Sequence, residues 1–141
     1  MGKINWTRVL IGGLIAGVVG NVLMFAAWAL FTRPSLSAAL LALGQPLQET
    51  GVAAVIMVVL GFLVMILVIW LYAAIRPRYG AGPRTALVAG IAAGLLFVVF
   101  PDIGWGLTLR LIPARVWAVD AVVSLVVIVI ATLVGAWAYK E

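Results

Sequence analysis

The charged residues divide this chain into four long apolar runs, and this pattern constrains the fold more than any other feature. A helix of about 20 apolar residues can cross the hydrocarbon core of a bilayer, which is about 30 Å thick. None of the runs alternates polar and apolar residues as a membrane β-strand does. We therefore expect an all-α, integral membrane four-helix bundle that forms a single transmembrane domain over residues 1–141. The predicted spans cover residues 8–31, 52–75, 85–107 and 116–139.

The composition excludes a water-soluble protein and most catalytic chemistry. Apolar residues make up 67% of the chain and charged residues 9%, whereas soluble domains average about 45–50% and about 25%. Cysteine and histidine are both absent, which removes disulfides, thiolate and imidazole metal sites, and histidine-based catalysis. We expect no catalytic residue, no cofactor and no metal site, and hence a protein that is not an enzyme.

The basic residues predict the orientation of the spans, because Lys and Arg near span ends favour the cytoplasmic side. Six of them would share a side with both termini, which predicts cytoplasmic termini in a multi-pass protein of the inner membrane of the cell. No basic patch with interleaved aromatic residues lies outside the spans, so we expect no nucleic-acid partner. The predicted inner side carries Lys3, Arg8, Arg76, Arg78, Arg84 and Lys140, and the outer side Arg33, Arg110 and Arg115.

The segments between the spans contain prolines with predictable effects. Pro34 can begin a short interfacial helix over residues 34–43, which could lie on the outer leaflet, cap the bundle or dock a partner. In the connection between spans two and three, Pro77 is expected to end one helix and Pro83 to start the next.

Small residues spaced four apart predict where helices pack closely within lipid. Span one has such a pair at Gly13 and Gly17, and span three has another at Gly90 and Gly94. We therefore expect spans one and three to make the closest contact of the bundle, in their cytoplasmic halves.

The two halves of the chain share a faint repeat. Arg8 precedes the first glycine pair much as Arg84 precedes the second, and Trp70-x-Tyr72 ends span two as Trp137-x-Tyr139 ends span four. Each half is one hairpin, so such a repeat would be parallel, and the common composition of membrane helices is the alternative explanation. The aromatic residues at these span ends, Tyr72 and Tyr139 included, are expected to anchor the helices at headgroup level.

Three polar residues lie in or at the edge of the spans: Asn21, Asp102 and Asp120. Ionisable groups in a membrane are costly, so each of these residues is a candidate for function. Counting about 1.5 Å per residue places both aspartates at a similar depth near the outer interface. We expect them to form a shallow salt-bridge cluster with Arg110 and Arg115 that joins spans three and four. A single Asn in span one is expected to form an interhelical hydrogen bond.

The same residues support a second interpretation. Pro101 can break span three and free backbone groups near Asp102, and several transporters hold cations at interrupted helices of this kind. Asn21, Asp102 and Asp120 would then form a polar or ion-binding site.

Three stretches at the membrane edges also carry a resemblance. They are residues 4–13 (INWTRVLIGG), 75–83 (IRPRYGAGP) and 135–141 (GAWAYKE). They resemble an uncharacterised family of small bacterial four-span integral membrane proteins, which implies the same architecture but transfers no activity. Members of that family often have an acidic residue shortly after the position of Asn21, where this chain has the apolar residues 22–25.

The size and span number are also similar to those of small multidrug-resistance exporters. Those proteins rely on a glutamate within the first span, whereas the glutamates of this chain, Glu49 and Glu141, lie outside the spans. Proton-coupled drug export is therefore not expected.

Our functional expectation is a non-enzymatic protein that acts through interaction, as an accessory subunit of a membrane complex or as an oligomeric scaffold. Missing catalytic residues, an apolar exterior and small-residue packing faces favour it. The alternative is a small oligomeric transporter or channel that uses Asp102 and Asp120. An intramembrane protease with the two aspartates as its dyad is a third hypothesis. The expected surroundings are the lipid bilayer and either a membrane-protein partner or a second copy.

Overall fold

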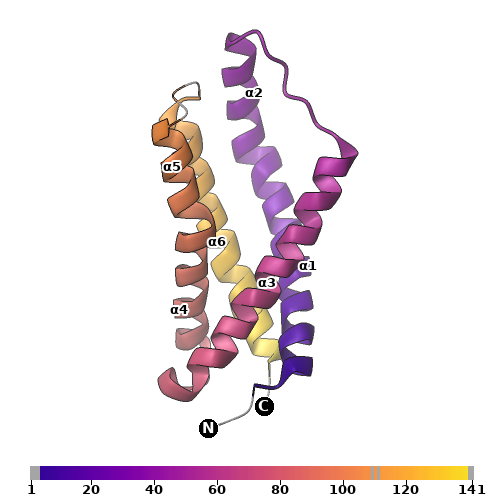
Figure 1. The fold of residues 1–141 in the computed structure, drawn as a ribbon, viewed down its shortest axis with the longest axis vertical. Helices are drawn as coiled ribbons and strands as arrows, with labels where there is room; N and C mark the ends of the chain where they lie inside the picture. The colour runs from indigo at the N-terminus through magenta and orange to yellow at the C-terminus, as the bar shows by residue number, and fades with distance from the viewer. Residues whose placement is uncertain (1–3, 109, 111, 140–141) are drawn as a thin grey trace.

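The computed structural model describes residues 4–108, 110 and 112–139, and its four long apolar helices confirm the all-α four-helix bundle of a multi-pass membrane protein. The described residues contain no strand. The first and third spans each consist of three joined pieces, with a π-helical segment in the middle (Figure 1). The elements are α1 (Trp6–Ala27), η1 (Trp28–Thr32), α2 (Arg33–Ala42), α3 (Gly51–Tyr79), α4 (Pro83–Gly94), η2 (Leu95–Val99), α5 (Phe100–Thr108) and α6 (Ala114–Ala138).

The bundle has a closed end and an open end. The start of α1, the end of α6 and the α3–α4 connection meet at the closed end, where the Asn5 N–H donates to the Tyr139 hydroxyl over 3.4 Å (Figure 1). The opposite, open end contains α2, the start of α3 and the α5–α6 connection, and there the helices diverge. Lys3 and Lys140, on which part of the charge argument depends, lie outside the described residues.

Two helices pass a proline by widening into a π-helix. Segment η1 ends two residues before Pro34, and η2 ends two residues before Pro101. The Arg33 N–H bonds to the Trp28 carbonyl, five residues back, and the Phe100 N–H does the same in η2. A proline lacks an N–H and clashes with the carbonyl four residues before it. In the wider π turn the hydrogen bonds run to the carbonyl five residues back, so the helix can continue past the proline. Pro101 therefore does not break span three, and that expectation is wrong.

The helix predicted over residues 34–43 is present as α2, but it is not separate from the first span. It continues α1 and η1 through Pro34 as one 37-residue helix that extends beyond the rest of the bundle (Figure 1). The helix ends where expected, because Gly44 adopts φ 71° and its N–H bonds to the Leu41 carbonyl.

Pro77 does not end the second span, contrary to our prediction. Helix α3 continues to Tyr79 and stops at Gly80, which adopts φ 84° and donates its N–H to the Arg76 carbonyl over 2.9 Å. A positive φ is the usual way for a glycine to terminate a helix. Pro83 does start the next helix, as predicted.

The closed half is held together by a backbone contact between two glycines. A β-carbon built on Gly12 of α1 would lie 2.8 Å from the carbonyl oxygen of Gly135 in α6, and one on Gly135 would lie 2.6 Å from that of Gly12. The side chain of Ile69, from α3, packs against both glycines and is completely buried. Three helices therefore meet at this point, at a distance that only glycine permits.

The predicted close contact between spans one and three is wrong. Gly13 and Gly17 of α1 face α3, where the Phe62 ring fills the space beside Gly17, while Gly90 and Gly94 of α4 face α6. Helix α1 packs against α3 and α6, and α4 packs against α6 and, less extensively, α3. A small-residue pair shows where a helix can be approached, and here large side chains of other helices occupy both positions.

Tyr72 and Tyr139 close the bundle and are not headgroup anchors, which corrects that expectation. Both side chains are 3% exposed, and their rings meet edge to face with centroids 5.9 Å apart. The Tyr72 hydroxyl accepts the N–H of Gly82, the N-cap residue of α4, as the Tyr139 hydroxyl accepts that of Asn5, the N-cap residue of α1. The two hairpins therefore share a closing contact as well as a π-helix before a proline, which is the arrangement that a parallel repeat would give.

Replacing Gly135 by Ala should destabilise the bundle, because the added methyl group would overlap the Gly12 carbonyl. Overpacking of this kind costs about 1–3 kcal/mol. Gly104→Ala is the matched control, since a β-carbon there meets nothing within 4 Å and alanine favours a helix by roughly 1 kcal/mol. Unfolding of both variants in mixed detergent and dodecyl sulfate micelles, followed by circular dichroism, measures the difference. Equal stabilities would contradict the close contact.

Candidate polar site at the open end

Three polar side chains from three elements meet near the open end. The Thr32 hydroxyl of η1 donates a 2.6 Å hydrogen bond to Oδ1 of Asp120 in α6. The carboxyl of Asp102, from α5, lies beside that of Asp120. The structure therefore brings together the two aspartates that the sequence placed at a similar depth, and adds a hydroxyl to them.

The two aspartates occupy equivalent positions in their helices. Asp102 lies six residues before the last residue of α5, and Asp120 lies six residues after the first residue of α6. At a rise of about 1.5 Å per residue, each lies about 9 Å inside its helix end. Both π-helical segments adjoin this level, since Thr32 is the last residue of η1 and η2 ends three residues before Asp102. Such segments frequently occur at functional sites.

The predicted salt-bridge cluster is wrong. Within the described part of the chain, neither aspartate forms an ion pair with Arg110 or Arg115, and both arginines are exposed at the α5–α6 connection. The ion pair at this end joins the Nε of Arg33 to Oε1 of Glu49 over 2.7 Å. Asp102 is buried and Asp120 is partly buried, whereas Arg110 and Arg115 are exposed.

The carboxylate pair contains an unsatisfied acceptor. The Asp102 side chain is 9% exposed, and its Oδ2 atom is buried without a hydrogen-bond partner among the described residues. Buried polar atoms normally have partners, because leaving one unpaired costs free energy. Asp120 is partly exposed. The described chain thus places two acidic groups together and supplies no positive charge beside them.

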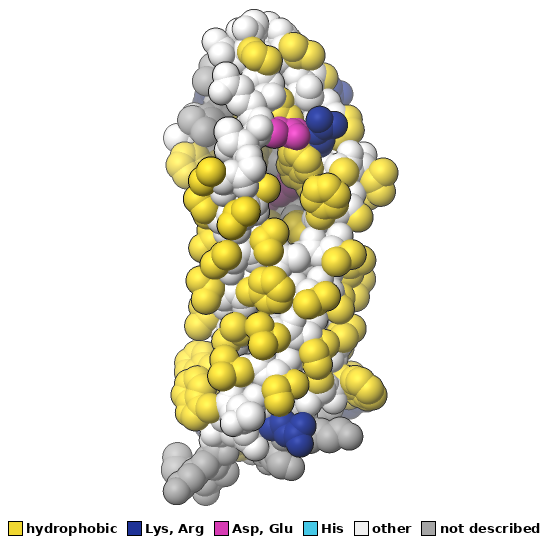
Figure 2. Space-filling view, turned by 90° about the vertical axis from the view of Figure 1, so that its right-hand side faces the viewer, with side chains coloured by type: hydrophobic (Ala, Val, Ile, Leu, Met, Phe, Trp, Pro, Cys, Tyr) yellow, Lys and Arg dark blue, Asp and Glu magenta, His cyan; other side chains and the backbone are white. Residues whose placement is uncertain are grey.

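A hollow opens beside this cluster. Figure 2 shows acidic atoms recessed between apolar side chains, below the acidic and basic side chains at the surface. A cavity of about 240 Å³ also lies against one face of the open half of α3, formed by Ala54, Val55, Val58 and Val59.

The open half of α3 is poorly covered by the other helices. Every residue over 51–60 is exposed, whereas Met65, Val68 and Ile69 in the closed half are buried. Asn21 marks the point at which α1 and α3 separate. Its Nδ2 donates to the Val58 carbonyl over 3.3 Å and to the Gly17 carbonyl of its own helix over 2.9 Å.

Asn21 therefore forms the interhelical hydrogen bond that the sequence predicted. Neither of its hydrogen bonds involves Asp102 or Asp120, so the structure does not bring the three candidate polar residues into one site.

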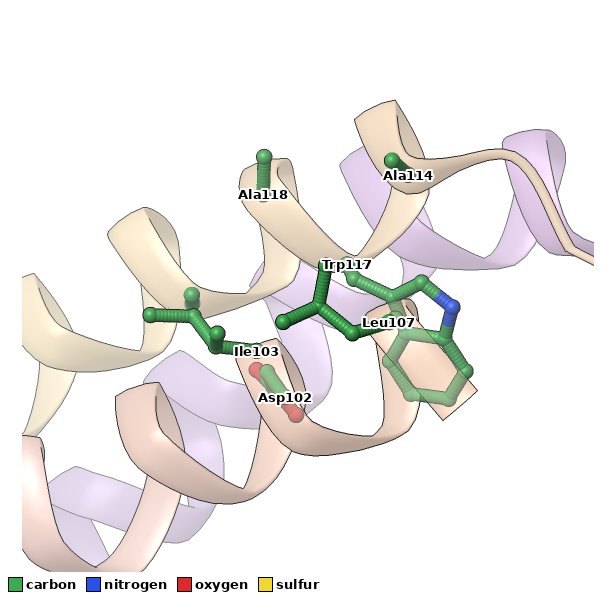
Figure 3. Close-up of a pocket in the computed structure, with 8 residues that line it drawn as sticks. Asp102, Ile103, Leu107, Ala114, Trp117 and Ala118 are labelled. Carbon is green, nitrogen blue, oxygen red and sulfur yellow. The ribbon is translucent and has the colours of Figure 1, made fainter. Parts of the chain in front are cut away.

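A second cavity, of about 160 Å³, lies between α5 and α6 and borders Asp102 (Figure 3). Ile103, Leu107 and Trp117 form much of its wall. Because the wall is almost entirely apolar, this cavity suits a hydrocarbon group better than an ion.

Sequence reasoning missed Thr32. Threonines are common in membrane helices, and a lone hydroxyl gives no signal of its own. The available signal was only that Thr32 and Asp102 each lie within two residues of a proline, Pro34 and Pro101 respectively.

Comparisons of this chain with protein-family models, with curated proteins and with solved structures gave no match. The function is therefore argued from the residues and their geometry.

Replacing Thr32 by Val should destabilise the protein. Valine keeps the shape of threonine but removes the hydroxyl that donates to Asp120. An unsatisfied acceptor costs about 1–3 kcal/mol when it is fully buried, and the loss here should be at the low end of that range because Asp120 is partly exposed. Thr32→Ser should restore most of the loss. Ser35→Ala is the control, since that hydroxyl makes only a 3.4 Å exposed bond to the Phe31 carbonyl. The same micellar unfolding assay compares them, and a Val variant as stable as the Ser variant would contradict the role of the hydroxyl.

Proposed function

We propose that this protein is a non-enzymatic subunit of a membrane assembly, and that a membrane-spanning segment of a partner completes its open half. The observation that carries this proposal is the juxtaposition of an uncovered helix with an uncompensated acidic pair. Every residue over 51–60 of α3 is exposed, and no described basic residue forms an ion pair with Asp102 or Asp120.

Lipid can cover the apolar part of this surface but cannot pair with its acidic groups. Acyl chains can cover the apolar side chains of α3, but they offer no positive charge and no hydrogen-bond donor to a carboxylate. Ionisable residues within a membrane normally pair with other groups in the protein or its assembly. A protein segment that covers α3 and also reaches Asp120 would satisfy both needs.

The packing of the two halves supports the same division of roles. The closed half is held by glycine contacts and buried side chains, which favours a fixed base. The open half of α3 begins with Gly51, Ala53 and Ala54, whose small side chains permit close approach by another helix. Met57, further along, is an adaptable side chain of the kind common at binding surfaces.

The proposal also covers the membrane in which the protein lies and its orientation there. We place the protein in the inner membrane of a bacterial cell, with the closed end in the cytoplasm. Arg8, Arg76, Arg78 and Arg84 belong to the closed end, and this excess of basic residues supports a cytoplasmic position.

A photoreactive amino acid at Val55 should cross-link to protein in intact cells, because Val55 belongs to the uncovered face of α3. The same group at Val88, on the exposed face of α4, is the control and should react with lipid. Gel electrophoresis and mass spectrometry identify the adducts, and an adduct of two copies of this chain would indicate the oligomeric scaffold. No protein adduct at Val55, or the same adducts at both positions, would contradict the proposal.

A second candidate function is a small oligomeric transporter or channel that uses Asp102 and Asp120. The specific observation in its favour is the carboxylate pair with a hydroxyl beside it, which could hold a cation. The tightly packed closed half offers no support for a path through a single chain.

If transport is the function, Asp102→Asn should abolish cation uptake into proteoliposomes while the helix content stays unchanged. The substitution removes the charge and keeps the shape of the side chain. Uptake of radioactive sodium and rubidium measures this. Wild-type protein without uptake, or a variant with full uptake, would eliminate this second candidate.

A further inference from the structure

We infer that the partner segment carries a lysine or arginine in its outer third, and that this basic side chain pairs with Asp120 and Asp102. The inference rests on the proposed assembly function and adds to it the chemistry by which the partner is recognised.

The first step is the charge balance at the site. The carboxyl groups of Asp102 and Asp120 lie beside each other. The guanidinium of Arg33, which follows Thr32 in the chain, is engaged by Glu49 and stacks over the Trp28 ring, with the guanidinium carbon 5.8 Å from its centroid. Arg110 and Arg115 are exposed and form no ion pair with the aspartates. The described residues therefore form no ion pair with either aspartate, which leaves both carboxyl groups available to a basic side chain of a partner.

The second step is the number of ligands. A multivalent metal ion would need further oxygen or nitrogen ligands, and the described residues hold no group of three or more metal-ligating side chains. An ammonium group has three donors and a guanidinium five, and neither needs a complete shell of protein ligands. The unpaired Oδ2 of Asp102 and the exposed part of Asp120 are acceptors for such donors.

The third step is access. Asp120 is partly exposed while Asp102 is buried behind it, so a side chain reaches Asp120 first. Acidic atoms are visible in a recess on the side of the molecule that Figure 2 presents. The shallow depression formed by Ala54, Val55, Val58 and Val59 on the exposed face of α3 is apolar and suits contact with the apolar side chains of a partner helix.

The fourth step is depth. Both aspartates lie about 9 Å inside their helix ends. Basic side chains on a membrane-spanning helix are long enough to bring their charge to such a position. The partner's basic residue should therefore stand about six residues from the outer end of its helix.

A synthetic membrane-spanning peptide tests this without knowledge of the natural partner. The probe is a leucine–alanine helix with one lysine six residues from its outer end, reconstituted with the protein in phosphatidylcholine vesicles. Matched peptides carry leucine or glutamate at that position, or place the lysine at the helix centre. Energy transfer between labelled peptide and labelled protein measures association, for wild type, Asp102→Asn and Asp120→Asn.

We expect the lysine peptide to associate about tenfold more tightly than the leucine peptide. Either Asn variant should remove that advantage, whereas the glutamate and central-lysine peptides should gain none. In the resulting double-mutant cycle, the coupling between lysine and aspartate isolates the charge interaction. If an Asn variant fails to fold, the peptide series on wild-type protein still decides the question.

The other outcomes separate the two claims. Equal association of the lysine and leucine peptides with wild type would contradict the inference that the partner carries a basic residue. It would not contradict the proposal that a partner helix docks on this surface. A lysine advantage that survives in both Asn variants would also contradict the inference of a basic residue. No association of any peptide would count against the docking surface, and thus against the proposed function itself.

Discussion

The contact between Gly12 and Gly135 is the interaction on which the rest of the structure depends. It brings the backbones of α1 and α6 together in the closed half, and Ile69 of α3 seals the crossing. Helices in lipid gain little from burying apolar surface against one another, so close backbone approach has to supply much of the association. Once α1, α3 and α6 are fixed at this point, their directions fix how far they diverge at the other end.

The open half follows from that crossing. Asn21 donates to the Val58 carbonyl, and beyond this contact α1 and α3 separate, so that every residue of α3 over 51–60 is exposed. The π-helical segments then place polar side chains at the same level as this opening. One of them ends at Thr32, and the other lies just before Asp102. The result is a tightly packed closed half and an open half in which α3 is exposed and the two aspartates form no ion pair with the described residues.

Much of this fold could be predicted from the sequence, because it depends on local quantities. Charged residues delimit the spans, and a constant helical rise was enough to place Asp102 and Asp120 at one depth. The interhelical bond of Asn21 followed from the cost of an unpaired amide in lipid. These inferences required no knowledge of which helices are neighbours.

The errors concern relations between elements and the effect of prolines within helices. Gly13 and Gly90 belong to faces that can be approached closely, but the sequence does not say by which helix, and large side chains of α3 and α6 fill those positions. Prolines predict breaks, yet a π turn absorbed Pro34 and Pro101 within continuous helices. Arg110 and Arg115 are near Asp102 in the chain, but they point away from the helix interface into which the aspartates project.

The account depends most directly on the two carboxyl groups lying side by side. The chain contains only two aspartates, Asp102 and Asp120, so labelling aspartate with ¹³C at the side-chain carboxyl introduces just two labelled sites. Solid-state NMR of the protein in bilayers then measures the dipolar coupling between them. The account predicts a strong coupling that disappears in Asp102→Asn. An absent or weak coupling in the wild type would mean that the pair does not form, and would contradict the account.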